Sequence, residues 1–218
     1  MSRRAASSAL RLLVFDKTCT ETYGFGLSTI WSAGSGVYRA LQRQDARFGA
    51  TTWAEALGWH ATYEPDRPIA EIQYWGHGKW GCVKIDDDGF GSPELDASHA
   101  HAPVIDAIRD RLLPNGEALI WLRTCEAFGA DAGIDFAHRL AHRMRAKVAG
   151  HTYVIGALQS GLRALEPGKR PRWSSVEGLR EGTPAAPREA FTSRVLAPRT
   201  IHFMANGFPQ EWFAEDGA

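Results

Sequence analysis

Two residues that could act as a nucleophile and its base each follow a predicted strand in this sequence. His77 lies between two glycines after the apolar segment 72–75, and Cys125 follows the apolar segment 118–122. A cysteine attacks a carbonyl carbon only as its thiolate, and an adjacent imidazole can accept the thiol proton. The pair therefore indicates acyl transfer, with Cys125 as nucleophile and His77 as general base. The backbone amides of Gly78 and Cys125 are the expected donors to the developing oxyanion.

The elements that must position these residues alternate between strands and helices. The predicted elements are, in chain order, a strand over 10–16, one or two helices within 31–57, a strand over 71–75, a small hairpin over 79–89, a helix over 103–113, a strand over 118–122, a helix over about 132–145 and a strand over 147–150. This alternation is typical of a mainly parallel sheet with helices on both faces, whose active groups lie at the carboxyl ends of the strands. We therefore predict a single α/β domain over residues 1–218.

The remaining segments carry weaker patterns. Residues 164–190 are rich in proline and glycine, and they predict a long surface loop rather than a second domain. Residues 191–204 alternate between apolar and polar side chains, which predicts a terminal strand or hairpin on the same sheet. Residues 1–8 are expected to be disordered.

The order of these motifs resembles the caspase- and gingipain-like clan of cysteine peptidases, clan CD, which includes CHAT-like proteins. In that clan a His-Gly motif and a Cys motif end successive strands in the same order and at similar separation. The segment 118–125, followed by Gly129, Gly133 and the segment 148–150, is especially similar to uncharacterised bacterial members. The resemblance covers residues 70–156 and, more loosely, residues 10–16. It implies a three-layer caspase-like fold and a cysteine endopeptidase that acts on a peptide or protein substrate without a cofactor.

The sequence departs from the caspase pattern directly around Cys125. The caspase motif has Gln-Ala before the cysteine, whereas Arg123 and Thr124 stand there in this chain. The adjacent Glu126 is expected to raise the pKa of the Cys125 thiol, which disfavours the thiolate. The alternative is therefore a non-catalytic member of the fold, a binding or scaffold module in which His77 and Cys125 are structural.

Other residues are candidates for substrate contacts at the rim of this site. Asp16 and His151 each end a predicted strand, and Glu126 follows the candidate nucleophile. For Asp16 and His151 a simple polar cap of the strand is the favoured interpretation. Trp173 and Ser174 lie in the long loop, which the resemblance implies could shape a substrate pocket.

Cys19 and Cys82 are interpreted as structural, because free cysteines are among the most buried residue types. His138 and His142 lie four residues apart on a predicted helix, but no acidic residue of a metalloprotease signature lies between them. We therefore expect no metal site. The glycines at 24–26 and 76–78 lack phosphate-binding spacing, so no nucleotide site is expected either.

Charge and composition exclude several classes of partner. The chain has 25 Lys and Arg against 25 Asp and Glu and a pI near 7.1, which gives no electrostatic reason to expect nucleic acid or an acidic membrane surface. No segment approaches the roughly 20 apolar residues of a spanning helix, and the run 12–15 is too short for a signal-peptide core. Three unpaired cysteines favour a reducing compartment, so a cytoplasmic location is expected. The sequence indicates no oligomeric state.

Overall fold

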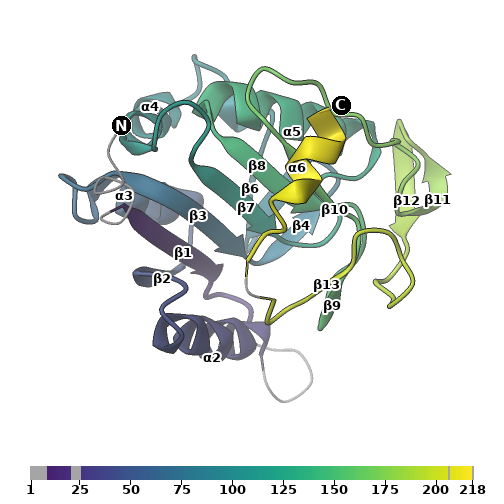
Figure 1. Cartoon of the computed structure of the whole chain (residues 1–218), viewed down its shortest axis with the longest axis horizontal. Coiled ribbons are helices and arrows are strands. Elements are labelled where there is room, and N and C mark those ends of the chain that lie inside the picture. The colour runs from purple at the N-terminus through teal and green to yellow at the C-terminus, as the bar shows by residue number, and fades with distance from the viewer. Residues whose placement is uncertain (1–8, 21–25, 206, 218) are drawn as a thin grey trace.

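A six-stranded sheet forms the centre of the structure (Figure 1). The computed structural model describes residues 9–20, 26–205 and 207–217, so the segment 1–8, expected to be disordered, lies outside the described residues. The sheet order is β10-β8-β7-β3-β1-β2, and every pairing is parallel except that of β10 with β8. Its strands are β1 (Leu10–Asp16), β2 (Ala46–Ala50), β3 (Ile69–Trp75), β7 (Leu119–Arg123), β8 (Lys147–His151) and β10 (Leu162–Leu165). The predicted mainly parallel sheet is confirmed.

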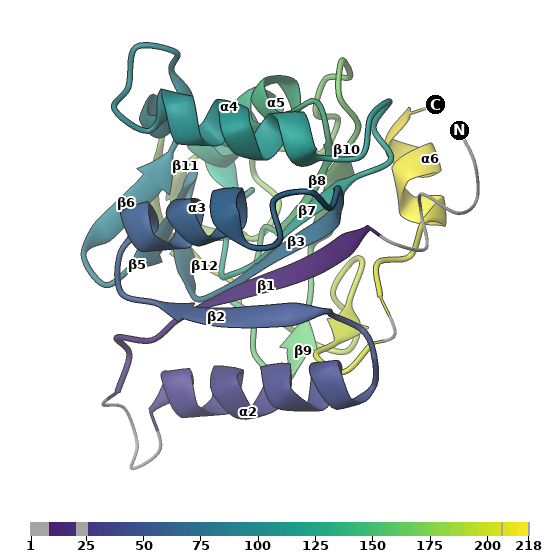
Figure 2. The same cartoon turned by 90° about the vertical axis from the view of Figure 1, so that its left-hand side faces the viewer.

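Helices cover both faces of the sheet, as expected (Figure 2). They are α2 (Leu27–Ala40), α3 (Trp53–Thr62), α4 (Ala102–Arg111), α5 (Ala130–Met144), the short 3-10 helix η1 (Pro93–Leu95) and α6 (Glu211–Gly217). Helices α3, α4 and α5 lie on one face, and α2 lies on the other. Leu12 and Val14 of β1 pack toward α3–α5, whereas Leu13 and Phe15 pack with Tyr38 of α2. A strand covered on both sides needs consecutive apolar residues, and β1 has them.

Local sequence explains where the helices begin and which side they bury. Helix α3 starts after Thr52, whose hydroxyl accepts a hydrogen bond of 3.2 Å from the Glu55 N–H and so satisfies one free amide of the first turn. Phe136, Leu140 and Met144 of α5 recur every four residues, and all three are buried. This spacing places them on one side of the helix, which packs on the sheet.

Three small sheets surround the central one. The sheet β4-β5-β6 comprises β4 (His77–Lys79), β5 (Cys82–Ile85) and β6 (Asp88–Gly91). The other two are the hairpin of β11 (Leu179–Thr183) with β12 (Ala186–Ala190), and the pair of β9 (Leu158–Gln159) with β13 (Ile201–His202). The hairpin and β9–β13 lie on the same side of the molecule in Figure 1.

These small sheets correct two expectations. The segment 164–190 is not one continuous loop, because it contains the end of β10 and the hairpin of β11 and β12. Most of that hairpin is exposed, so its strands lack the apolar alternation that identifies a strand in a sequence. Residues 191–204 do not extend the central sheet. In the described part of the chain β13 pairs with β9, and the antiparallel β10 forms the edge of the central sheet next to β8. The short β2 was not predicted.

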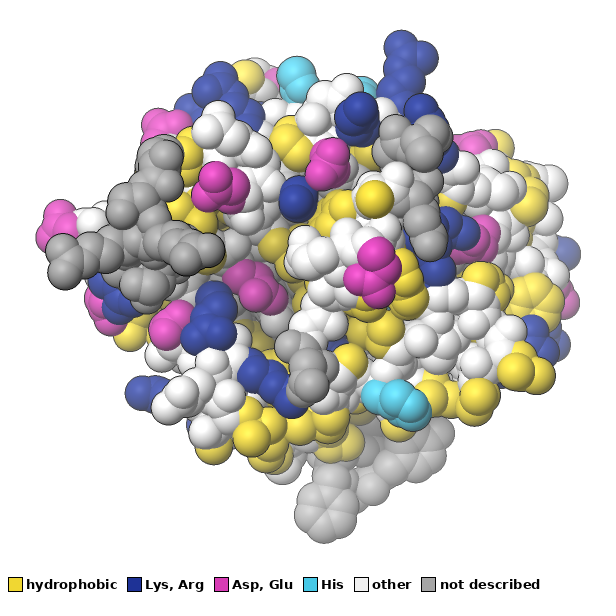
Figure 3. Space-filling view, viewed as in Figure 1, with side chains coloured by type: hydrophobic (Ala, Val, Ile, Leu, Met, Phe, Trp, Pro, Cys, Tyr) yellow, Lys and Arg dark blue, Asp and Glu magenta, His cyan; other side chains and the backbone are white. Residues whose placement is uncertain are grey.

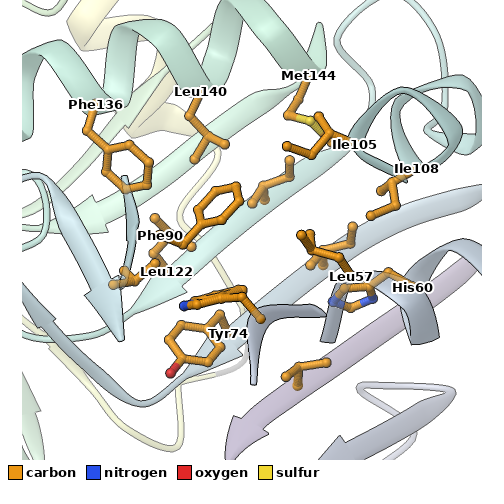
Figure 4. A pocket seen from close by; sticks show the side chains of 15 residues that line it. Leu57, His60, Tyr74, Phe90, Ile105, Ile108, Leu122, Phe136, Leu140 and Met144 are labelled. Carbon is orange, nitrogen blue, oxygen red and sulfur yellow. The ribbon is translucent and has the colours of Figure 1, made fainter. Parts of the chain in front are cut away.

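A small apolar cavity of about 60 Å³ lies in the core between the sheet and the helices α3, α4 and α5 (Figure 4). His60 lines it, and the Nδ1 atom of this buried ring has no hydrogen-bond partner among the described residues. Burial lowers the pKa of His60 to about 3. The ring is therefore neutral in the folded protein at neutral pH, and this cavity is a feature of core packing.

The surface of the molecule carries both signs of charge. Figure 3 shows acidic and basic side chains interspersed over one face. Within the described part of the chain, no helix combines the length and the apolar character needed to cross a membrane.

Candidate active site

The pairing of β3 with β7 places His77 and Cys125 at the same edge of the sheet. The two strands are parallel, and Trp75 lies opposite Arg123 at their carboxyl ends. A single residue separates the end of β3 from His77, and a single residue separates the end of β7 from Cys125. Neighbouring strands therefore bring the two candidate residues to the same edge of the sheet.

Gly78 packs directly against the backbone that follows β7. A Cβ atom at this position would lie 2.5 Å from Thr124 Oγ1 and 2.7 Å from the carbonyl oxygen of Cys125. Real Cβ atoms essentially never come so close, so only glycine fits here without displacement. The His-Gly motif thus touches the cysteine segment. The oxyanion role of the Gly78 and Cys125 amides stays a prediction.

His77 and Cys125 also line one cavity of about 920 Å³ at this edge of the sheet. Its walls come from α2, the ends of β3 and β7, the segment 154–157, and residues 202–204 near the C-terminus. Most of the lining is apolar and includes Leu27, Ile30, Trp31, Ile155, Phe203 and Met204. This volume suits a small-molecule or peptide side-chain site, which typically measures roughly 300–1,000 Å³.

The residue Cys125 is half-buried where it lines this cavity. Its sulfur accepts a hydrogen bond of 3.4 Å from the Ile155 N–H and lies 3.8 Å from the Ile155 carbonyl oxygen. Burial raises the pKa of the thiol, the Glu126 charge adds to this effect, and the Ile155 amide opposes it. At neutral pH Cys125 is therefore a neutral thiol, and its proton must be removed during any attack.

The imidazole of His77 contacts a different thiol. Its Nε2 atom lies 3.3 Å from the sulfur of Cys19, and the edge of Trp31 packs on the ring at 5.4 Å between centroids. Cys19 follows the carboxyl end of β1, which pairs in parallel with β3. The structural interpretation of Cys19 is therefore corrected: it belongs to the candidate site.

The signal that identifies Cys19 was available in the sequence. Like His77 and Cys125, this residue comes shortly after a central strand, and the carboxyl ends of parallel strands share one edge of a sheet. Cys82 differs, because it lies within β5, where its sulfur donates to the Val83 carbonyl oxygen at 3.6 Å. Its structural interpretation agrees with this position.

Two of the predicted substrate contacts are buried strand-end residues. Asp16 is fully buried, and its Oδ1 accepts hydrogen bonds from the Thr18 amide at 2.8 Å and the Thr18 hydroxyl at 2.6 Å. The Nδ1 atom of His151 lies 3.1 Å from the carbonyl oxygen of Ser160, and burial lowers the pKa of this ring to about 3. Neither residue lines the cavity, so the cap interpretation describes Asp16 better than a substrate contact.

The other three predicted contacts also lie outside the cavity. Glu126 is buried, and its Oε2 has no hydrogen-bond partner among the described residues. Trp173 is buried because its chain segment folds back on the core, where the indole N–H donates to the Phe128 carbonyl at 2.9 Å and the rings stack. Ser174 is exposed beside it, and its hydroxyl accepts from the Val176 N–H at 3.4 Å. The structure corrects the expectation that this loop segment walls the site.

Arg123 is a cavity residue that sequence reasoning treated only as a departure from a motif. Its guanidinium is buried and donates to Gln159 Oε1 at 2.8 and 3.1 Å, to the Tyr38 hydroxyl at 2.6 Å and to the Phe203 carbonyl at 2.7 Å. These bonds join β7 to α2, β9 and the C-terminal segment. A basic residue at the end of an apolar strand was the available signal.

No metal site emerges from the described residues, which contain no cluster of three or more His, Cys, Asp or Glu side chains able to hold an ion. His138 and His142 lie on an exposed side of α5.

The fold and the site define an α/β protein with a thiol and an imidazole at the carboxyl edge of a mainly parallel sheet. The chain matches none of the family models, curated proteins or solved structures with which it was compared.

Proposed function

We propose that this protein is a cysteine peptidase, or a related acyl-transfer hydrolase, of the caspase-like fold. Cys125 is the nucleophile and His77 the general base. The observation that carries the proposal is that both residues line one cavity while Gly78 packs against the Cys125 backbone. The order of a strand, a His-Gly motif, a neighbouring strand and a cysteine supports the resemblance to clan CD.

The reaction proceeds through a thioester. His77 accepts the proton of the Cys125 thiol as the sulfur attacks the carbonyl carbon, and a carbon–sulfur bond forms. The bond to the leaving amine or alcohol then breaks, and His77 returns the proton to the leaving group. Water hydrolyses the thioester, which releases the acid and regenerates the thiol. The Ile155 N–H, which already donates to the sulfur, stabilises negative charge there.

His77 must turn between two thiols in this mechanism. Its Nε2 atom contacts Cys19 in the structure, so the ring has to leave Cys19 before it can serve Cys125. The side chain is exposed, and its rotation needs no rearrangement of the core. A reducing, cytoplasmic compartment, which the three free cysteines favour, would keep both thiols available.

A non-catalytic binding module is the second candidate function. The observation in its favour is that the Cys125 thiol has a raised pKa and hydrogen-bonds to Ile155 rather than to His77. In this alternative the cavity binds a ligand and leaves it unchanged.

Single-cysteine substitutions separate these functions. Hydrolysis of an activated N-acyl amino acid ester is measured for the wild type and for Cys125→Ala, Cys19→Ala and Cys82→Ala. We expect Cys125→Ala to lower kcat/KM by at least about 1,000-fold, as for loss of a nucleophile, and Cys82→Ala to have no effect. Cys19→Ala should retain activity, because it frees Nε2 of His77.

Two results would contradict the assignment. Loss of hydrolysis in Cys19→Ala but not in Cys125→Ala would make Cys19 the nucleophile. Hydrolysis that does not depend on any of the three thiols would leave the binding module as the function.

A further inference from the structure

The cavity beside Cys125 is walled mainly by apolar side chains. Leu27 and Ile30 of α2 form part of it, and Ile155 and Met204 contribute from the segments that follow β8 and β13. Burial of a Leu or Phe side chain against such walls contributes about 10- to 100-fold in affinity. The space is large enough to take such a side chain in full.

Cationic ligand groups find no carboxylate among the described residues that line this cavity. None of its described lining residues is Asp or Glu. A Lys or Arg side chain would therefore lose its hydration without gaining an ion pair, which is unfavourable. The described walls therefore favour an apolar group over a basic one.

Arg123 carries the one permanent charge among the described lining residues. Its guanidinium already donates hydrogen bonds to groups of the protein, which limits its use by an anionic ligand group. All three guanidinium nitrogens of Arg123 donate hydrogen bonds, to Gln159, Tyr38 and the carbonyl of Phe203. Aromatic rings also enclose the guanidinium, with its carbon 4.4 Å from the Trp121 ring centroid and 5.4 Å from that of Trp75. Four of the five N–H groups are used in this way, so a carboxylate could form a two-bond pair with the guanidinium only by displacing bonds that hold four elements together. Arg123 thus shapes the cavity rather than receiving an acidic group.

We infer that this cavity selects substrates with a large apolar side chain on the residue whose carbonyl Cys125 attacks. The inference rests on the proposed function and names its substrate class. A Leu-like or Phe-like side chain fills the apolar walls, while ionised side chains meet neither a free acid nor a free guanidinium among the described residues.

The first test measures binding without chemistry. The N-acetyl amides of Leu, Phe, Lys and Asp are titrated into Cys125→Ala and followed by tryptophan fluorescence, because Trp31 and Trp75 line the cavity. We expect the Leu and Phe amides to bind about 10- to 100-fold more tightly than the Lys and Asp amides. Equal affinities, or tighter binding of either charged amide, would overturn the inference.

A matched pair of variants on α2 tests whether the selection arises in this cavity. Ile30 lines the cavity and is 51% exposed, whereas Val37 lies outside it on the same helix and is 44% exposed. Each is replaced by Asp, because both side chains are exposed. Ile30→Asp should reduce the preference for the Leu amide over the Lys amide by about 10-fold, through a lost apolar contact and a new partner for the ammonium group. An equal effect of Val37→Asp would contradict the assignment to this cavity.

Hydrolysis of the corresponding 4-nitrophenyl esters by the wild type then separates this inference from the proposed function. Selective binding of Leu and Phe amides with no Cys125-dependent hydrolysis would support the apolar selection and refute acyl transfer. Cys125-dependent hydrolysis that favours the Lys or Asp ester would support acyl transfer and refute the apolar selection.

Discussion

At the scale of single residues, the protonation state of Cys125 determines what the site can do. Its half-buried position beside Glu126 raises the pKa of the thiol, so little thiolate exists at neutral pH. A preformed thiolate–imidazolium pair is therefore not the resting state of Cys125. His77 has to act as a base during the attack, which makes the position of its ring decisive.

This state of Cys125 predicts a pH profile for alkylation. Because the thiolate is the reacting form, the rate of Cys125 labelling by iodoacetamide should still rise above pH 9.0, the ordinary value for a cysteine. Glu126→Gln should speed labelling, since it removes a negative charge that raises the pKa. Peptide mapping by mass spectrometry follows each thiol separately. A plateau of the Cys125 rate below pH 8 would show that its pKa is lowered instead.

Sequence reasoning reached some site residues and missed others for physical reasons. His77 and Cys125 were predictable because strand periodicity places both at the end of a strand, and parallel neighbours share an edge. The burial of Trp173 away from the site was not predictable, because its contact with Phe128 joins segments 45 residues apart and no local pattern encodes it. Cys19 was missed because a lone cysteine is more often a buried structural residue.

At the scale of elements, the contact of β4 with the end of β7 depends on a glycine. Gly78→Ala would place a Cβ within 2.7 Å of the Cys125 carbonyl oxygen, and a backbone atom cannot move aside cheaply. We expect a loss of roughly 1–3 kcal/mol in the free energy of unfolding and a fall in esterase activity. Urea denaturation and ester hydrolysis measure the two effects.

Gly58 supplies the control for this substitution. It lies inside α3, and a Cβ there would have no neighbour within 4 Å. Gly58→Ala should therefore stabilise the protein by up to about 1 kcal/mol, because alanine favours the helix. If both substitutions had the same effect, steric contact at Gly78 would not be the cause.

The central elements were predictable, whereas the peripheral ones were not. The strands and helices that build the sheet have clear apolar periods, as in β1 and α5. The hairpin of β11 and β12 is mostly exposed, and the pair of β9 and β13 has two residues in each strand. Such short or exposed strands are defined by their partners rather than by their own side chains.

At the scale of the whole molecule, two buried histidines couple stability to pH. Burial lowers the pKa of His60 and of His151 from 6.5 to about 3. Between these values the unfolded chain binds more protons than the folded one, so stability falls as pH falls. Each ring should remove about 2 kcal/mol from the free energy of unfolding between pH 7 and pH 5.

Substitution of one buried histidine separates its contribution to the pH dependence of stability from the contribution of the carboxylates. His60→Leu removes one titrating ring and should reduce the loss between pH 7 and pH 5 by about 2 kcal/mol in urea denaturation. His142→Gln on the exposed side of α5 is the control and should leave the loss unchanged. An unchanged pH dependence in His60→Leu would show that His60 is not neutral in the folded state.

Identification of the acylated thiol shows directly whether Cys125 is the nucleophile and His77 its base. The protein is mixed with N-acetyl-leucine 4-nitrophenyl ester and quenched in acid, and mass spectrometry of its peptides locates the thioester. We expect an acyl group on Cys125 in the wild type and none there in His77→Ala. An acyl group on Cys19, or equal acylation of all three cysteines, would contradict this assignment.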